Sequence, residues 1–461
     1  RRPLKGARMA PRSHEEAQLV SRRYPYYVLG LVVLANMCAF ATRSVVYALH
    51  DPLVAEFGIG ERDFGLMHSV FVWTFALAAV FWAVIADRCA RRRILAIGMF
   101  LWGLGCFASA AAPQFTTLLW ARGLVGLAQA VGPTAGVALL MEWFERGRRA
   151  RAIGAFSAAM VAGAGVGYFV GGYFASHEVA RTVLPWAPWR TALVLIGLPG
   201  IPLAVLLATV RDSGRGPSYR GPASLLSRQG WIELSEVVRR RSLLCVVGAD
   251  TSFCFGMAVL QVFGPAFLQQ HRGYAVGATP VWELVAAGVI SVASGGLGFW
   301  CATWIVDRTQ PRRPNVSTVC GAAGGAVLAP LLLLLILGTS KAAGLLLLAP
   351  TAFFMAWQGG LAVVATQALA PVHLTATTLG FLALSNNLVG EASGAWAAGA
   401  VSDAQGGSME AALLLAPAAM LLCSGLFLFA SRTAGDDVAT IHALEQQAGQ
   451  STARAPGDSS D

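Results

Sequence analysis

Twelve long apolar runs, separated by short polar stretches, constrain this chain more than any other feature of its sequence. In the first half the runs cover 24–49, 64–86, 94–112, 115–140, 152–175 and 189–210. In the second half they cover 243–268, 281–306, 316–337, 344–369, 378–401 and 411–430. Each run is long enough to cross about 30 Å of hydrocarbon as a helix. The runs predict an all-α membrane protein with twelve transmembrane helices.

The composition agrees with a membrane location. The chain has 461 residues, of which 56% are hydrophobic and 13% are charged, whereas soluble domains carry roughly 25% charged residues. So few charges cannot cover the apolar residues with a polar shell, so the lipid bilayer is an expected partner. The net charge of +10 does not indicate nucleic-acid binding, because the basic residues form short clusters between the runs and not one basic face.

The basic residues predict the orientation and the domain organisation. Most of the 34 Lys and Arg lie in the tails and in alternate loops, while the opposite loops hold only Arg62, Arg181, Arg190, Arg272 and Lys341. This asymmetry predicts that both termini are cytoplasmic. We also expect the protein to be a monomer and to lie in the cytoplasmic (inner) membrane. We expect a cytoplasmic tail at 1–23, six-helix bundles at 24–210 and 242–430, a cytoplasmic linker at 211–241 and a disordered cytoplasmic tail at 431–461.

A charged motif occurs at equivalent places in the two halves. The second run is followed by Asp87, Arg88, Arg91 and Arg92. The eighth run is followed by Asp307, Arg308, Arg312 and Arg313. The motif resembles the G-x-L-a-D-R-x-G-R-R signature of the major facilitator superfamily, with Ala83 and Ala90 at its glycine positions. The resemblance implies two pseudo-symmetric six-helix bundles and transport by rocker-switch alternating access.

These charges are candidates for a gate. An acid at a helix end can pair with an Arg of a neighbouring loop, and this pair must break when that side opens. The gate candidates are Asp87, Arg88, Arg91, Arg92, Asp307 and Arg308. The alternative is a basic cluster that only sets the topology.

A narrower resemblance covers most of the chain. It is carried by Asn36 to Arg43, by Arg122 to Gln129, by Trp143-Phe144-Glu145 with Arg148 and Arg151, and by 387–391 with 399–403. These stretches resemble the spinster-like branch of the superfamily, near the organic-anion symporter group. Thr42 and Gln129 stand where the branch usually has Asp and Glu, which are associated with proton coupling in that family, so its proton relay is incomplete here.

Four ionisable residues lie inside the apolar runs, where a charge costs about 2.5–3.5 kcal/mol on insertion scales and therefore usually has a function. Arg43 and Arg122 are expected at similar depth, and no carboxylate of their own half accompanies them, so the pair predicts a site for a carboxylate or phosphate. The alternative is pairing with carbonyls, or with Asp51 or Glu56. The candidate substrate-binding residues are Arg43, Arg122, Gln129, Thr42, Asn36, Asn387 and Glu391.

Glu391 and Asp250 are the other two, and both are proton-coupling candidates. Burial can bring a carboxyl group into a useful titration range, but Glu391 would stay ionised if Arg43 or Arg122 approached it across the cavity. A structural hydrogen-bonding role is the alternative for each. Because Thr42 and Gln129 cannot titrate, we expect weak proton coupling that disappears in Glu391→Gln.

Other motifs favour structural roles. Gly163, Gly167 and Gly171 have a spacing that permits close helix packing. The eight cysteines show no metal-binding spacing, so neither a metal nor a cofactor is expected. His50, His68, His177, His271 and His373 are expected in or beside loops as ordinary polar residues. No pattern of nucleophile and base is evident, so the chain is not expected to be an enzyme.

Taken together, the sequence predicts a secondary or facilitative transporter of an organic anion. The candidate cargo is a lysolipid, as the spinster resemblance implies, or a small carboxylate or sugar acid, with H⁺ as a further candidate partner. Aromatic residues such as Trp73, Phe75 and Trp357 suit either cargo. A membrane sensor that kept the fold without transporting is the alternative.

Overall fold

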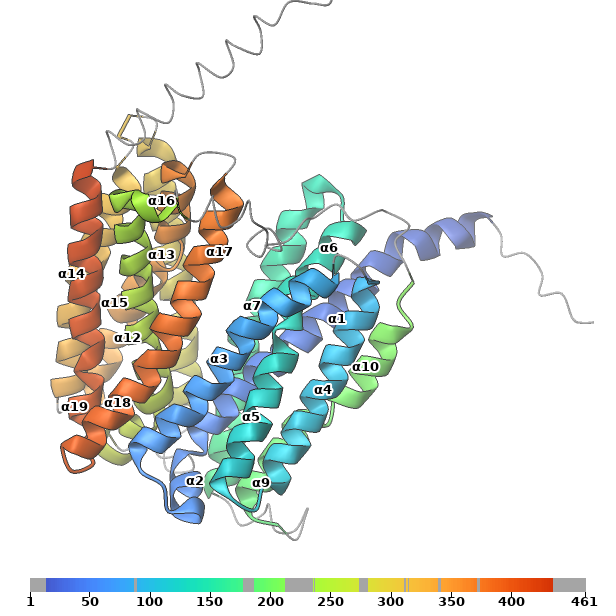
Figure 1. Cartoon of the computed structure of the whole chain (residues 1–461), viewed down its shortest axis with the longest axis horizontal. Coiled ribbons are helices and arrows are strands. Elements are labelled where there is room, and N and C mark those ends of the chain that lie inside the picture. The colour runs from blue at the N-terminus through green and yellow to red at the C-terminus, as the bar shows by residue number, and fades with distance from the viewer. Residues whose placement is uncertain are drawn as a thin grey trace, which may run out of the picture.

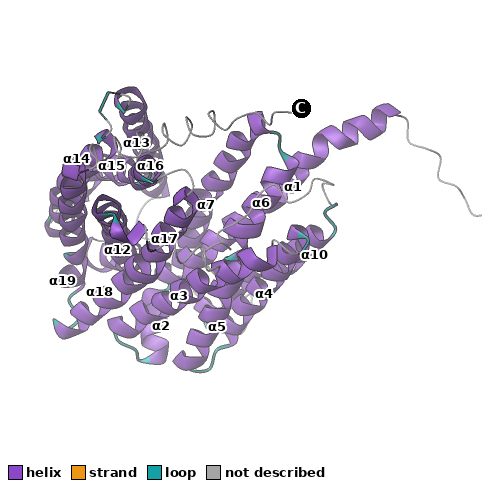
Figure 2. Cartoon of the chain, turned by 45° about the horizontal axis from the view of Figure 1, so that its top comes forward, coloured by secondary structure: helices purple, strands orange, loops and turns teal. Residues whose placement is uncertain are grey.

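The computed structural model describes residues 14–86, 89–176, 186–211, 235, 237–272, 281–310, 312–313, 315–338, 341–370 and 374–433. The regular structure within these residues is helical (Figures 1 and 2). Eleven of the described helices are long and apolar enough to cross a membrane. The stretch Thr375–Ala404 is also continuously helical and corresponds to the remaining predicted run.

The first half contains the following helices: α1 His14–Ala48, α2 His50–Phe57, α3 Glu61–Ala86, α4 Arg91–Ala111, α5 Phe115–Gln129, η1 Gly132–Gly136, α6 Val137–Trp143, α7 Arg146–Ser176, α9 Pro188–Gly197 and α10 Gly200–Ala208. The helix α1 begins ten residues before the predicted run, because 14–23 contains neither Gly nor Pro and Pro25 is accommodated within the helix.

The second half contains α12 Arg241–Arg272, α13 Val281–Thr309, α14 Val316–Leu337, α15 Lys341–Gln358, α16 Leu361–Leu369, α17 Thr375–Ser385, η4 Asn386–Glu391, α18 Ala392–Ala404 and α19 Met409–Leu413. The span that begins with α19 continues to Thr433. Figure 1 shows the two halves side by side.

Two predicted runs contain π-helical turns, and two others, 189–210 and 344–369, are each divided into two α-helices. A π-helical turn, η1, separates α5 from α6 and contains Pro133, and a second, η4, ends at Glu391. A proline removes a backbone donor, and π-turns are frequent at functional sites. The chain stays helical through η4, and the stretch from α5 to α6 still forms one candidate span.

Closely approaching helices hold each half together. Added Cβ atoms at Gly163, Gly167 and Gly171 of α7 would overlap backbone atoms of α1, so these glycines let the two helices pack backbone to backbone. The structural interpretation of the glycine spacing is confirmed.

The contacts between the halves gather at one end of the molecule. There α3 lies along α18, and a Cβ at Gly65 or Gly399 would overlap the carbonyl of Ala395 or Glu61. Toward the other end, α3 and α17 diverge (Figure 1). We call the end where α3 begins and α18 ends the closed end, and the other the linker end.

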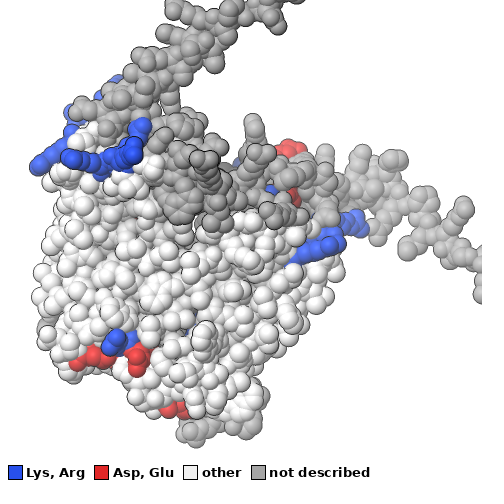
Figure 3. Space-filling model, in the orientation of Figure 1, with Lys and Arg blue, Asp and Glu red and all other residues white. Residues whose placement is uncertain are grey.

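Charge is distributed as a membrane requires. On the face shown in Figure 3, charged residues lie toward the two ends and the surface between them carries none. Many large apolar side chains of the membrane-length helices are exposed, among them Phe81, Trp120, Phe169, Leu346 and Leu421. This pattern confirms a multi-pass membrane protein.

Candidate functional site

An ion pair joins the two halves deep within the helices. Arg43 of α1 places Nη1 3.5 Å from Oε1 of Glu391 in η4, with side-chain exposures of 14% and 21%. A helix of one half thus contributes the cation and a helix of the other half contributes the anion. Of the two possibilities predicted for Glu391, the structure shows the one in which an Arg approaches it.

Aromatic rings enclose the Arg43 guanidinium. Its Cζ lies 5.0 Å from the ring centre of Phe40, 4.7 Å from that of Phe71 and 4.8 Å from that of Phe75. Such contacts stabilise a cation and also form an apolar wall beside it. The surroundings of Arg43 therefore combine one charge with a large apolar surface, which suits an amphiphilic anion.

Arg122 of α5 is almost completely buried, with an exposure of 3%. Its Cζ lies 5.2 Å from the ring centre of Phe71, so Phe71 contacts both guanidiniums. Among the described residues, neither Nε nor Nη1 of Arg122 has a hydrogen-bond partner. The two carboxylates predicted as alternative partners for the arginines have other partners, since Asp51 pairs with His50 and Glu56 with Arg190. Arg122 therefore adds a buried positive charge beside Phe71.

Gln129 connects Arg43 to the backbone. Its Oε1 accepts from Arg43 Nε at 3.4 Å, and its Nε2 donates to the Ala39 carbonyl at 3.1 Å. Thr42 and Asn36 face other helices, because Thr42 accepts from Trp102 Nε1 at 3.1 Å and Asn36 donates to the Phe156 carbonyl at 2.8 Å. The structure therefore brings Gln129 to Arg43, but not Thr42 or Asn36.

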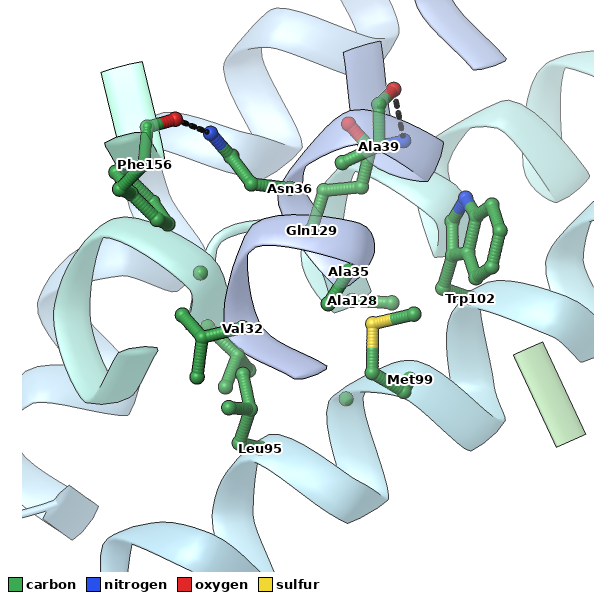
Figure 4. Close-up of a pocket in the computed structure, with 13 residues that line it drawn as sticks. Val32, Ala35, Asn36, Ala39, Leu95, Met99, Trp102, Ala128, Gln129 and Phe156 are labelled. Carbon is green, nitrogen blue, oxygen red and sulfur yellow. Dashed lines mark hydrogen bonds between the residues drawn. The ribbon is translucent and has the colours of Figure 1, made fainter. Parts of the chain in front are cut away.

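A small cavity lies beside Asn36 and Gln129. Asn36 and Gln129 line it together with Met99, Trp102 and Phe156 (Figure 4). Its volume of about 30 Å³ suits about one water molecule. It is too small for an organic anion, so the ion pair between the halves is the better candidate for a substrate site.

The turn η4 is tied to α12. Asn386 Nδ2 donates to Asp250 Oδ2 at 2.6 Å and Thr251 donates to Asn386 Oδ1 at 3.3 Å. Asn387 donates to the Ala383 carbonyl within its own helix. The hydrogen bond from Asn386 to Asp250 holds η4, which carries Glu391, against α12. This contact agrees with the structural role that the sequence left open for Asp250.

His68 is a site residue that sequence reasoning missed. It lies within α3, is 3% exposed, and places Nε2 3.8 Å from Oε1 of Glu391. Its Nδ1 lies 2.8 Å from the Tyr47 hydroxyl. The expectation of an ordinary polar residue near a loop is wrong, because His68 lies on the face of α3 that packs against α1 and η4. The buried residues Phe64 and Phe71, one helical turn to either side, were the available signal.

The gate candidates lie at the linker end. Asp87 and Arg88 are outside the described residues. Arg91 pairs with Glu142 at 2.6 Å, and Arg92 Nη1 donates to the Val210 carbonyl at 2.5 Å, so both contact their own half here. Asp307 is exposed beside a small pocket between α13 and α16, and Arg308 lies over the Trp304 ring. His177 and His373 are also outside the described residues.

A second charged cluster holds the closed end together. His50 is buried, with Nδ1 2.7 Å from Asp51 Oδ1 and Nε2 2.7 Å from Glu61 Oε2. Gln270 of the second half donates to Asp51 at 2.8 Å. Asp403, at the end of α18, accepts from the backbone N–H groups of Glu61 and Arg62 at 3.0 Å each, which places a carboxylate at the positive end of α3.

The cluster around His50 should weaken at alkaline pH. Burial alone would lower the pKa of His50, but its hydrogen bonds to Asp51 and Glu61 raise that pKa from 6.5 to about 9. All three residues belong to the first half, so the raised pKa stabilises the folded arrangement of α2 and the start of α3. This contribution, about 3 kcal/mol, is complete below about pH 6.5 and is lost as the pH rises through about 9. The unfolding temperature of the wild type should therefore fall between pH 7 and pH 10 by more than that of His50→Gln. An equal fall in both proteins would contradict this role.

A comparison with protein families fits this architecture. A model of the Major Facilitator Superfamily matches residues 32–395. The chain belongs to this superfamily. This superfamily consists of transporters, and a solved transporter structure of the superfamily has the same fold. The predicted fold is therefore confirmed, as is the expectation that this superfamily member is not an enzyme.

Related sequences narrow the resemblance within the Major Facilitator Superfamily. The chain is 26% identical over 391 residues to the protein spinster of Drosophila melanogaster, covering 83% of this chain and 62% of that protein. It is 27% identical over 314 residues to the sphingosine-1-phosphate transporter SPNS2 of Mus musculus, covering 65% and 55%. The chain thus spans less than two thirds of the length of either relative. These matches confirm the resemblance to the spinster-like branch.

Solved structures of the superfamily share this fold. A bacterial homologue of the human lysosomal transporter Spinster, in an inward-facing and unoccupied conformation, superposes with a TM-score of 0.74 at 19% identity, covering 91% of this chain and 98% of that one. A xylose transporter of E. coli in an inward-open conformation gives a TM-score of 0.63 at 15% identity, with coverages of 88% and 96%. Both matches concern the fold.

Proposed function

We propose that this protein is a secondary or facilitative transporter that carries an organic anion by rocker-switch alternating access. The observation that carries the proposal is the ion pair between Arg43 and Glu391, which joins the halves at the point where Phe40, Phe71 and Phe75 surround the cation. An anion that binds Arg43 competes with Glu391, so its binding alters the contact between the halves. Substrate binding is thereby linked to the motion.

The favoured substrate is a lysolipid with an anionic headgroup. A guanidinium binds phosphate or carboxylate oxygens with charge-assisted hydrogen bonds, and the adjoining rings provide a surface for an acyl chain. One relative is a sphingosine-1-phosphate transporter, which supports this choice. Small carboxylates and sugar acids are the second class, since they satisfy the charge but leave the rings without a partner.

A thermal-shift screen tests the substrate class. A ligand that binds the folded protein stabilises it by RT ln(1 + [L]/Kd). Lysophosphatidylglycerol and sphingosine 1-phosphate should raise the unfolding temperature of the protein in nanodiscs, more than glucuronate or monoacylglycerol does, and not in Arg43→Ala. Equal stabilisation of Arg43→Ala, or a larger shift with the neutral lipid, would contradict the anion site.

The orientation remains a proposal from the charge distribution. We place the linker end and both termini on the cytoplasmic side of an inner membrane, with the linker and tails at the boundaries predicted above. In this orientation the closed end is external, and the structure corresponds to an inward-facing state. The charged motifs then act as the cytoplasmic gate, through Asp87, Arg88, Arg91, Arg92, Asp307 and Arg308.

The gate should depend on its acids. Asp87→Asn and Asp307→Asn should each slow transport severalfold without reducing membrane insertion, because the carboxylate is lost while the basic loops that set the topology remain. Glu410→Gln, an exposed acid at the other end, is the matched control and should transport normally. Normal rates in both gate variants, over a range of substrate concentrations, would show that the motifs only set topology.

A further inference from the structure

His68 lies in contact with the ion pair but has no role in the function described so far. Its Nε2 lies 3.8 Å from Oε1 of Glu391, and Arg43 Nη1 lies 3.5 Å from the same oxygen atom. Nε2 is buried and has no hydrogen-bond partner in the part of the chain that the structure describes. Two basic side chains thus lie close to the same carboxylate oxygen of Glu391. Arg43 is always charged, whereas His68 can gain or lose a proton.

The neighbours of His68 determine when it can carry a charge. From α1 it faces Tyr47 and Arg43, from α5 Arg122, and from η4 Glu391. Tyr168 of α7 lies beyond Tyr47, and Cys254 of α12 is within electrostatic range of Glu391. Burial disfavours a positive charge on His68 most strongly, and Arg43 and Arg122 also oppose it, whereas the Glu391 carboxylate favours it. Moving Arg43 away from Glu391 therefore favours a proton on His68.

We propose that His68 is a proton-binding residue. When an anionic substrate draws Arg43 away from Glu391, His68 binds a proton and forms an ion pair with Glu391 in place of Arg43. The neutral imidazole takes up one proton from the solution. In the resulting imidazolium, Nδ1–H donates to the Tyr47 oxygen and Nε2–H donates to Glu391 Oε1. Glu391 stays paired while Arg43 binds the anion, so proton binding and anion binding strengthen each other.

This inference rests on the proposed anion site and extends it. Thr42 and Gln129 stand where related proteins carry acids, and neither can titrate. His68 is a titratable group of the first half in contact with the ion pair. It would thus give the transporter a pH response without those carboxylates.

The pH dependence of ligand binding tests this role. The probe is lysophosphatidylglycerol, whose phosphodiester keeps one charge across this range, titrated against the protein in phosphatidylcholine nanodiscs between pH 6 and 8.5. For the wild type we expect the affinity to rise as the pH falls, by about tenfold per pH unit at most, the limit for uptake of one proton. His68→Gln and Glu391→Gln should both bind with an affinity independent of pH, whereas His271→Gln, the control for an exposed histidine stacked on Phe267, should keep the wild-type slope.

A second measurement needs no variant. Calorimetric titration of the wild type at pH 7.5, in buffers of different ionisation enthalpy, should show that protons are taken up with the probe. A wild-type slope in His68→Gln, or binding without proton uptake, would overturn the role of His68 alone. Failure of the wild type to bind the probe at any pH, or unchanged binding by Arg43→Ala, would instead overturn the anion site.

Discussion

Gly399→Ala should nearly abolish transport. A Cβ at this position would overlap the Glu61 carbonyl and the start of α3, so α3 and α18 would have to separate where they meet. Separation would also break the hydrogen bonds from Glu61 and Arg62 to Asp403. Because alternating access requires this end to close, we expect the transport rate to fall at least about tenfold, with spin labels at Ala55 and Gln405 held apart.

Gly425→Ala is the matched control, since an added Cβ there would meet no other described part of the chain within 4 Å. Gly65→Ala, whose Cβ would overlap the Ala395 carbonyl, should repeat the effect of Gly399→Ala. If both variants transport at the wild-type rate, the contact between α3 and α18 is not part of the transport cycle.

Arg43→Ala should weaken anion binding more than any other single truncation in the site. Charge-assisted hydrogen bonds contribute about 1.5–3 kcal/mol each, so the affinity for lysophosphatidylglycerol should fall about tenfold or more. Arg43→Lys should restore part of it, because Lys keeps the charge but loses the planar fork. Binding isotherms in nanodiscs measure both. Arg122→Ala, which removes charge from behind Phe71, should also weaken binding, whereas full affinity in Arg43→Ala would refute the site.

The fold was largely predictable because membrane insertion depends on local composition. Runs of apolar residues located the spans, and the repeated motif around Asp87 and Asp307 indicated the two halves. The interruptions at η1 and η4 were not predicted, because a turn such as the one ending at Glu391 depends on its packing against α12.

The charged residues of the site were predictable from the sequence, but the ion pair between Arg43 and Glu391 was not. Arg43 and Glu391 stood out because ionisable groups are costly within a bilayer. That they meet depends on how the halves dock, which no local pattern records. His68 was misassigned for the same reason, since its burial follows from the packing of α3 against α1 and η4.

The direct test of the central claim is counterflow in proteoliposomes. Vesicles loaded with unlabelled lysophosphatidylglycerol should take up the labelled lipid through the purified wild-type protein, whereas neutral monoacylglycerol should neither be taken up nor compete. Arg43→Ala should reduce this uptake to the level of protein-free vesicles. Equal uptake of the neutral lipid, or wild-type uptake by Arg43→Ala, would contradict anion transport through the Arg43–Glu391 site.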